Sequence, residues 1–208
     1  MPGRFISLEG GEGVGKSTQA RALVAALEAR GLSVLLTREP GGSAGAEAIR
    51  GLLLSGEADR WSTRAEALLF AAARADHIEK TILPALARGA WVICDRFLDS
   101  SRAYQSASGE LSDADILTLH QIGSGGFLPD RTLLLAMPAA EAERRAHLRD
   151  EGSADRIGGR EQQFHVLVAG AFEQFAATEP ERVRRVDASG EAAAVTTRLL
   201  AALADLLP

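Results

Sequence analysis

The residues best suited to chemistry form one glycine-rich segment near the N-terminus, Gly10-Gly11-Glu12-Gly13-Val14-Gly15-Lys16-Ser17. It matches the pattern G-x-x-x-x-G-K-[S/T] at every position. Glycines let successive backbone N–H groups turn toward an anion, and the following helix adds the positive end of its dipole. We expect Lys16 to reach the β- and γ-phosphates of ATP and the Ser17 hydroxyl to bind Mg²⁺. With Thr18, the segment is the predicted ATP-binding loop.

The context of this loop supports the prediction. An apolar run, Arg4–Glu9, precedes it, and Ser17–Arg30 carries apolar residues at helical spacing. The chain has two lysines, Lys16 and Lys80, and one of them stands where a compact ammonium is needed. The alternative, a glycine-rich turn with a solvated lysine, is disfavoured because pattern and context agree.

Charged residues also follow two other apolar runs. Arg38 ends a run at Ser33–Thr37, and Asp95-Arg96 closes a run at Trp91–Cys94. Ligands of an open parallel sheet bind beyond the carboxyl ends of its strands, so we expect these residues to surround the phosphate loop's crevice. Arginines that converge on a polyanion are typical of phosphoryl transfer, which depends on positioning and charge neutralisation.

The elements that position these residues alternate along the chain. Apolar strand-like runs are separated by longer stretches with helical periodicity. Five strands are expected, at Arg4–Glu9, Ser33–Thr37, Trp91–Cys94, Arg131–Ala136 and Arg182–Val186. Helices are expected at Ser17–Arg30, Ala44–Leu54, Arg64–Arg88, Ser100–Ser106, Ser112–Ile122, Ala139–Arg149, Glu161–Ala177 and Glu191–Leu207. The pattern predicts an α/β fold with a five-stranded parallel sheet covered by helices on both faces.

Composition limits the classes of function. The 208 residues suit one domain, and 46% hydrophobic with 25% charged residues predicts a folded core. A net charge of −5 argues against a nucleic-acid partner. No apolar stretch is long enough for a membrane span, and the N-terminus lacks a signal-peptide layout. With Cys94 as the single cysteine, we expect a cytoplasmic protein.

A phosphate loop is shared by several classes of protein. A GTPase needs an Asn-Lys-x-Asp segment, but the residues before the two lysines are Gly15 and Glu79. A chemomechanical ATPase usually has further domains, for which the chain has little room. A small-molecule kinase therefore fits best, and a nucleotide-dependent switch remains the alternative from another class.

Several segments together resemble the bacterial thymidylate kinases, and the resemblance runs almost from end to end. Besides the phosphate loop, the matching segments are Phe5–Gly10, Arg38-Glu39-Pro40-Gly41-Gly42, Phe70–Arg74, Asp95-Arg96, Asp99–Gln105 and Asp155-Arg156. The resemblance implies a single domain over residues 1–208 with the fold of the P-loop nucleoside monophosphate kinases. It also implies that ATP, with Mg²⁺, phosphorylates dTMP to dTDP, and that the protein is a homodimer joined through Arg64–Arg88. The nearest rival is a kinase of another nucleoside monophosphate.

The resemblance assigns the base-binding residues. It implies that Phe70 stacks on thymine and that Arg74 donates to a thymine carbonyl. The two are one helical turn apart, so one helix can present both, although Phe70 taken alone could be a core residue. Ser101 is expected to meet the N3 edge, and Tyr104 to crowd the sugar 2′ position. Gln105, in the same segment, is expected in the substrate site.

The remaining assignments concern phosphate and metal. The resemblance implies that Arg96, Arg38 and Arg50 grip the acceptor's monophosphate and that Asp95, with the loop serine, organises Mg²⁺. It places Glu12 opposite the acceptor's sugar 3′ hydroxyl. Lys16, Arg96 and Asp95 form the expected catalytic core, and Glu39 is expected to be structural.

A lid is expected at about residues 143–161, where arginines and glycines are dense. Relatives with a glutamate in the phosphate loop tend to draw a catalytic arginine from the lid, which favours Arg156, then Arg149 and Arg160. The chain departs from the family at Gly158, Ala169 and Ala136, where relatives often carry glutamate, arginine and aspartate. These departures bear on the lid and helix packing, whereas the phosphate loop and thymine-site residues are intact.

Overall fold

The computed structural model describes residues 2–57, 59–150 and 162–208, with only the backbone described at 147–150. Its strands are β1 (Phe5–Glu9), β2 (Val34–Arg38), β3 (Trp91–Asp95), β4 (Arg131–Ala136) and β5 (Val183–Asp187). Its helices are α1 (Lys16–Glu28), α2 (Ala44–Leu54), α3 (Thr63–His77), the π-helical segment η1 (Ile78–Ile82), α4 (Leu83–Ala87), α5 (Leu98–Ser106), α6 (Asp113–Ser124), α7 (Ala139–Asp150), α8 (Gln162–Thr178) and α9 (Ala192–Ala202).

The strands form one parallel sheet in the order β2-β3-β1-β4-β5. The prediction of a five-stranded parallel sheet is therefore confirmed. Because β1 lies between β3 and β4, the loop after β1 opens at the middle of the sheet. The register pairs Leu8 of β1 with Asp95 of β3, and Arg38 of β2 with Asp95 as well. The carboxyl ends of these three strands thus meet at one edge.

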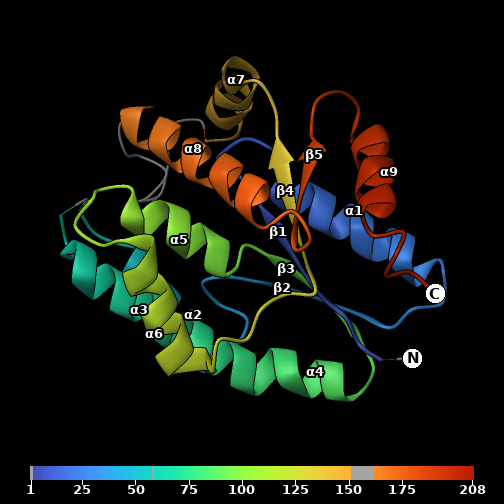
Figure 1. Ribbon diagram of the computed structural model, residues 1–208, viewed down its shortest axis with the longest axis horizontal. Helices are drawn as coiled ribbons and strands as arrows, with labels where there is room; N and C mark the ends of the chain where they lie inside the picture. Colours follow the sequence, from blue (N-terminus) through green and yellow to red (C-terminus); the bar gives the residue numbers. More distant parts are fainter. Residues whose placement is uncertain (1, 58, 151–161) are drawn as a thin grey trace.

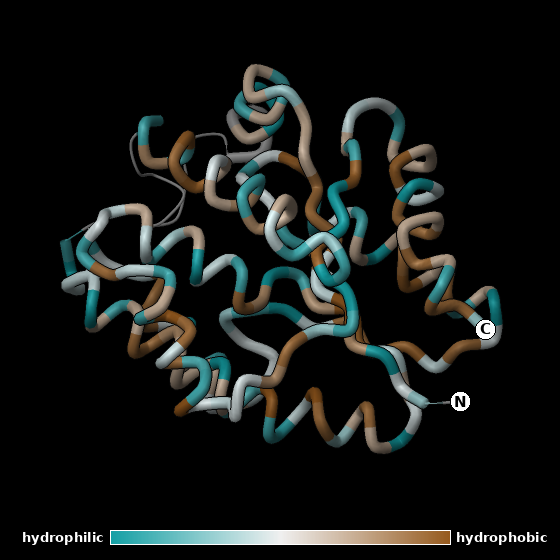
Figure 2. Tube along the Cα trace, in the orientation of Figure 1, coloured by the Kyte–Doolittle hydropathy of each residue, from teal (hydrophilic) through white to brown (hydrophobic). Residues whose placement is uncertain are grey.

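Alternation along the strands sends side chains to two cores. Ile6 and Leu8 lie in a core with residues of α1 and α9, whereas Phe5 of the same strand packs on the opposite side with Phe97 and Ile116. Figure 1 shows the corresponding layers, with α1 and α9 on one side of the sheet and α3 to α6 on the other. In Figure 2, hydrophobic and hydrophilic residues alternate along the helical segment that ends with α4, as expected for a helix that covers one face of a sheet.

Helix starts follow the sequence signals closely. Ser112, the residue before α6, accepts a hydrogen bond from the Asp115 backbone N–H, while the Asp115 carboxylate accepts from the Ser112 N–H. This reciprocal pair is a capping box. Gly15 precedes α1 with φ 89°, a left-handed conformation that favours glycine.

The predicted helix Arg64–Arg88 is not a continuous α-helix. Between α3 and α4 the chain widens into the π-helical segment η1. Pro84 lies just beyond it and has no N–H to donate to Lys80, which removes one α-helical hydrogen bond. At the other end of the chain, the α-helix predicted to reach Leu207 ends at Ala202.

A buried ionic cluster fixes α5 against the sheet. Both carboxylate oxygens of Asp99 accept from the Arg182 guanidinium, at 2.6 and 2.8 Å, and Arg102 donates to the same carboxylate. Arg102 also pairs with Asp113 of α6 and Glu179 after α8. Removing one partner of such a cluster leaves an uncompensated buried charge. The ionic cluster matters here because it holds α5 in place, and α5 carries several of the predicted substrate residues.

No helix within the described ranges combines the length and hydropathy that crossing a bilayer requires.

Candidate active site

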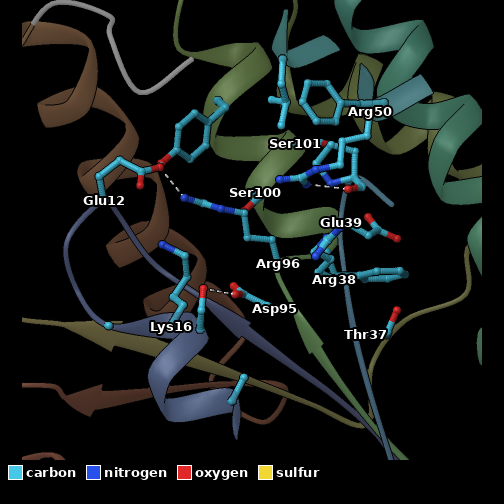
Figure 3. Close-up of a pocket in the computed structure, with 18 of the residues that line it drawn as sticks. Glu12, Lys16, Thr37, Arg38, Glu39, Arg50, Asp95, Arg96, Ser100 and Ser101 are labelled. Atoms are coloured by element: carbon cyan, nitrogen blue, oxygen red, sulfur yellow. Dashed lines mark hydrogen bonds and ion pairs between the residues drawn. The ribbon is translucent and has the colours of Figure 1, made fainter. Parts of the chain in front are cut away.

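A cavity of about 920 Å³ lies where the strands β1, β2 and β3 end. Figure 3 shows its walls, with Lys16 and Asp95 near the sheet edge and Arg96 extending toward Glu12. Most of the predicted site residues line it: Glu12, Gly13, Gly15, Lys16, Ser17, Thr18, Arg38, Arg50, Phe70, Arg74, Asp95, Arg96, Ser101, Tyr104 and Gln105. The predicted loop residues Gly10, Gly11 and Val14 do not line this cavity, and Val14 packs in the core instead.

The phosphate loop is held tightly by its neighbours. Gly10 has φ 139°, and a Cβ there would come within 2.4 Å of the Leu135 carbonyl oxygen. At Gly13, φ is 73° and a Cβ would lie 2.0 Å from the Ala142 carbonyl oxygen of α7. These two positions therefore require glycine, because φ is positive and because a side chain would collide with a backbone carbonyl oxygen. The loop is enclosed by β4 and by α7, the helix that begins the predicted lid.

Lys16 is buried within the loop. Its Nζ donates to the carbonyl oxygens of Gly10, at 3.1 Å, and Gly11, at 2.6 Å. Burial, together with the nearby Arg96 charge, lowers the pKa of Lys16 to about 8. An anionic ligand beside this ammonium would offset both effects, which suits a phosphate site.

Ser17 and Asp95 form a pair of hard oxygen donors at the mouth of the loop. The Ser17 hydroxyl donates to Asp95 Oδ2 at 2.5 Å. A hydroxyl and a carboxylate are suitable ligands for Mg²⁺, which commonly takes one or two protein ligands and completes its shell with phosphates and water. The residues present therefore fit the predicted metal.

Arg96 links the phosphate loop to α5. It has φ 70°, the one non-glycine residue among those described with a positive φ, and its guanidinium contacts the Glu12 carboxylate. The same guanidinium donates to Ser100 Oγ at 3.1 Å and lies 5.1 Å from the centre of the Tyr104 ring. The Tyr104 hydroxyl donates to Glu12 Oε1 at 3.2 Å. Strained backbone at such a position is typical of functional sites.

Glu9 is a buried acid beneath this arrangement. Its carboxylate accepts from the Phe97 N–H at 2.7 Å and from the Ser100 hydroxyl at 2.6 Å. Burial, followed by the nearby Asp99 charge, raises the pKa of Glu9 to about 7. Because Ser100 also contacts Arg96, Glu9 supports the arginine from below. Sequence reasoning did not assign Glu9 a role, since it ends an otherwise apolar run.

The raised pKa of Glu9 makes the free energy of unfolding depend on pH. With a pKa near 7 when folded and about 4.5 when unfolded, Glu9 binds more protons in the native state between these values. Its contribution to stability is thus greatest below pH 4.5 and is lost as pH rises through 7. Urea unfolding of the wild type and of Glu9→Gln at pH 5 and pH 8 measures this. The free energy of unfolding of the wild type relative to the variant should fall between these pH values, and a rise would contradict the assignment.

The far end of the cavity carries the predicted base-binding residues. Arg74 and Ser101 are both buried, and Arg74 Nη2 donates to Ser101 Oγ at 2.7 Å. Phe70 is partly buried against the core of α5 and α8 and also lines the cavity. It can therefore be a core residue and still offer a ring face to a bound base. Gln105 donates to Glu66 Oε1 at 3.0 Å, which ties α5 to α3.

The two other predicted phosphate-gripping arginines have protein partners. Arg38 Nη2 lies 3.2 Å from each carboxylate oxygen of Glu47, and Arg50 Nη1 donates to the Pro40 carbonyl oxygen at 2.7 Å. Both arginines line the cavity, and the Arg38 side chain is 56% exposed. A phosphate there would compete with Glu47 for Arg38.

Some predicted residues lie beyond what the structure describes. Arg156 and Arg160 fall outside the described residues, and Arg149 lies on α7 where only the backbone is described. Arg145 of the same helix lines the main cavity and also a second one of about 270 Å³ beside the phosphate loop. Among several arginines in this part of the sequence, nothing in the pattern singled out Arg145.

The fold and this cavity define the class of the protein. The phosphate loop follows the central strand of a parallel sheet and faces arginines at the ends of β2 and β3. This is the architecture of the P-loop nucleoside monophosphate kinases.

Comparison with known proteins identifies the family. The family model for thymidylate kinase matches residues 8–199. The chain is 63% identical over 208 residues to the thymidylate kinase of Rhizorhabdus wittichii, covering 100% of both chains. It is 50% identical to that of Caulobacter vibrioides, covering 95% of this chain and 94% of the other. A solved structure of thymidylate kinase from Ehrlichia chaffeensis superposes with a TM-score of 0.78 at 29% identity, covering 98% of this chain and 100% of that one. The chain belongs to the thymidylate kinase family.

Proposed function

We propose that the protein transfers the γ-phosphoryl group of ATP to dTMP, giving dTDP and ADP, with Mg²⁺ required. The observation that carries this proposal is the shared cavity. Lys16 and Ser17 of the phosphate loop line the same space as Arg96, Arg74 and Tyr104. A donor and an acceptor nucleotide can therefore meet end to end between these two groups, as in-line transfer requires.

On the donor side, the loop N–H groups and Lys16 hold the β- and γ-phosphates of ATP. Ser17 and Asp95 hold Mg²⁺, which neutralises charge on the transferring group when it is bound. The second cavity extends this side outward, between the phosphate loop and the residues Ala188–Ala192 that follow β5. We assign it to the nucleoside part of ATP, with Arg145 against the phosphates.

On the acceptor side, Arg96 directs the dTMP phosphate toward the γ-phosphorus and stabilises charge on the transferring oxygens. Arg38 and Arg50 provide further positive charge at the opposite wall. Glu12 accepts from the 3′ hydroxyl of the acceptor sugar, and its contacts with Arg96 and Tyr104 already hold the carboxylate in place. An oxygen of the dTMP phosphate attacks the γ-phosphorus of ATP. The bond between the γ-phosphorus and the oxygen that bridges it to the β-phosphate breaks, and ADP leaves.

The residues that recognise the base lie at the end of the cavity away from the phosphate loop. Phe70 stacks on thymine, Arg74 donates to a ring carbonyl, and Ser101 meets the N3 edge. Tyr104 crowds the 2′ position of the sugar and so favours deoxyribonucleotides, and Gln105 supports this wall from α5. The resemblance assigns Arg149 and Arg156, in the lid expected at residues 143–161, to the charge around the γ-phosphate; Arg156 and the Arg149 side chain lie outside the described part of the chain.

We also propose a homodimer formed through α3 and α6. These two helices pack together, and Leu68, Leu117 and Ile122 on them are 57%, 38% and 79% exposed. Exposed apolar side chains on two helices that pack together are typical of an interface between subunits. Because Cys94 is the single cysteine and is buried, the assembly needs no disulfide and suits the reducing cytoplasm.

Sedimentation equilibrium at micromolar concentration tests the dimer. The wild type should have twice the mass of the chain, and Leu68→Glu with Ile122→Glu should give the monomer mass, since buried unpaired carboxylates oppose association. Val166→Glu, at a 64% exposed position on α8, is the matched control and should stay dimeric. A monomeric wild type would contradict this interface.

The reaction is tested by identifying its products. Incubation with ATP, dTMP and Mg²⁺ should give dTDP and ADP in equal amounts, measured by anion-exchange chromatography. Replacing Mg²⁺ by EDTA should stop the reaction. ADP formed with inorganic phosphate but without dTDP would show a hydrolase instead.

A further inference from the structure

A chain of hydrogen bonds lies directly behind the base-binding arginine. His77 Nε2 and Thr37 Oγ1 are 2.7 Å apart, and His77 Nδ1 lies 3.0 Å from Glu39 Oε1. The other Glu39 oxygen accepts from Arg74 Nε at 2.8 Å. Thr37, Glu39, His77 and Arg74 are all buried, with His77 at 0% exposed. Figure 3 shows Glu39 and Thr37 on the wall formed by the end of β2. This chain connects β2 to α3.

The contacts of Arg74 fix its guanidinium on three sides. Nε donates to Glu39, Nη2 donates to Ser101, and the guanidinium lies 5.4 Å from the centre of the Phe97 ring. Among the described residues, no hydrogen bond uses Nη1. The direction in which this remaining group can donate is therefore set by the contact of Nε with the Glu39 carboxylate together with the contacts of Nη2 with Ser101 and the Phe97 carbonyl oxygen.

The Glu39 carboxylate is itself oriented by His77. A carboxylate only accepts, so Nδ1 of His77 carries the proton in this contact, while Nε2 of the same ring shares a hydrogen bond with the Thr37 hydroxyl. Gly42 fits closely around this pair, because a Cβ there would come within 2.4 Å of His77 Nε2 and of Thr37 Oγ1. The imidazole thus has one orientation, and the two carboxylate oxygens have separate partners.

We propose that His77 is a positioning residue for base selection, acting through Glu39 on Arg74. It holds the guanidinium where it meets a ring carbonyl and disfavours the amino group that a cytosine base presents instead. The inference rests on the proposed function and extends it to a residue that does not touch the substrate. It also gives Glu39, expected to be only structural, a part in recognition.

Substitutions at His77 separate positioning from mere support. His77→Leu removes the Nδ1 donor, which leaves Glu39 free to rotate. His77→Asn keeps a donor, because its amide nitrogen can occupy the place of Nδ1. Thr81→Val is the matched control, since the Thr81 hydroxyl donates to the Gly42 carbonyl at 2.7 Å in the same region without contacting Glu39 or Arg74.

The readouts are kcat and KM for dTMP and dCMP, KM for ATP, and Tm. For His77→Leu we expect the ratio of kcat/KM for dTMP over dCMP to fall about tenfold, through KM for dTMP, with KM for ATP unchanged. His77→Asn should restore the ratio to within about threefold of the wild type. Thr81→Val should lower Tm without changing the ratio.

The outcomes separate this inference from the proposed function. A wild type that does not phosphorylate dTMP overturns the function. A wild type that does so, together with a His77→Leu variant of unchanged base preference, overturns the positioning role alone. Equal losses toward dTMP and dCMP also overturn it, because they indicate general damage to the site.

Discussion

Replacing Lys16 by methionine is expected to lower kcat for phosphoryl transfer by about a thousandfold. The physical reason is the loss of a buried ammonium from the transferring phosphates, in a site where charge interacts more strongly than in water. Methionine fills a similar volume, so the loop should keep its shape. Coupled measurement of ADP release at saturating ATP and dTMP gives kcat directly.

The second lysine provides the control for this experiment. Lys80 pairs with Glu79 on an exposed surface, with 60% of its side chain accessible. Lys80→Met should therefore leave kcat unchanged, which separates the local effect from the loss of one positive charge. Retention of more than about a tenth of kcat by Lys16→Met would contradict the role given to the loop lysine.

Replacing Arg96 by lysine is expected to lower kcat by about a hundredfold with little change in Tm. Lysine keeps the charge but loses the planar fork that contacts Glu12 and Ser100 together. The ammonium cannot hold the acceptor phosphate and the Glu12 carboxylate at once. Single-turnover kinetics with enzyme in excess isolates this chemical step from product release.

Arg88→Lys is the matched substitution, at an exposed position beyond α4 and outside the cavity lining. Its kinetics should equal those of the wild type. If Arg96→Lys behaved in the same way, the positive φ and the contacts of Arg96 would have only a structural meaning.

The sequence predicted the fold well because its local signals agree with one another. Each expected strand lies within one residue of the observed one, since buried parallel strands are short apolar runs between breakers. The widening at Ile78–Ile82 was not predicted, because the helical periodicity continues through Pro84. Propensity alone gave no sign that the missing N–H would be accommodated by a π-helical turn.

The candidate site was predictable where residues follow a fixed spacing. The phosphate loop and the Asp95-Arg96 pair lie at strand ends, and topology brings strand ends together. The pairing of Arg38 with Glu47 could not be predicted, because it depends on side-chain conformation across a turn. The Asp99 cluster and the His77 chain join residues far apart in sequence, and single residue types carry no information about such partners.

A panel of nucleoside monophosphates tests whether dTMP is the phosphoryl acceptor. ADP release would be measured with ATP and Mg²⁺ while dTMP, dUMP, dCMP, AMP and GMP are supplied separately. We expect strong turnover with dTMP and at least tenfold lower kcat/KM with each of the others. Preferred turnover of another monophosphate would contradict the base assignment. Tight ATP binding without turnover of any acceptor would show a nucleotide-dependent switch instead of a kinase.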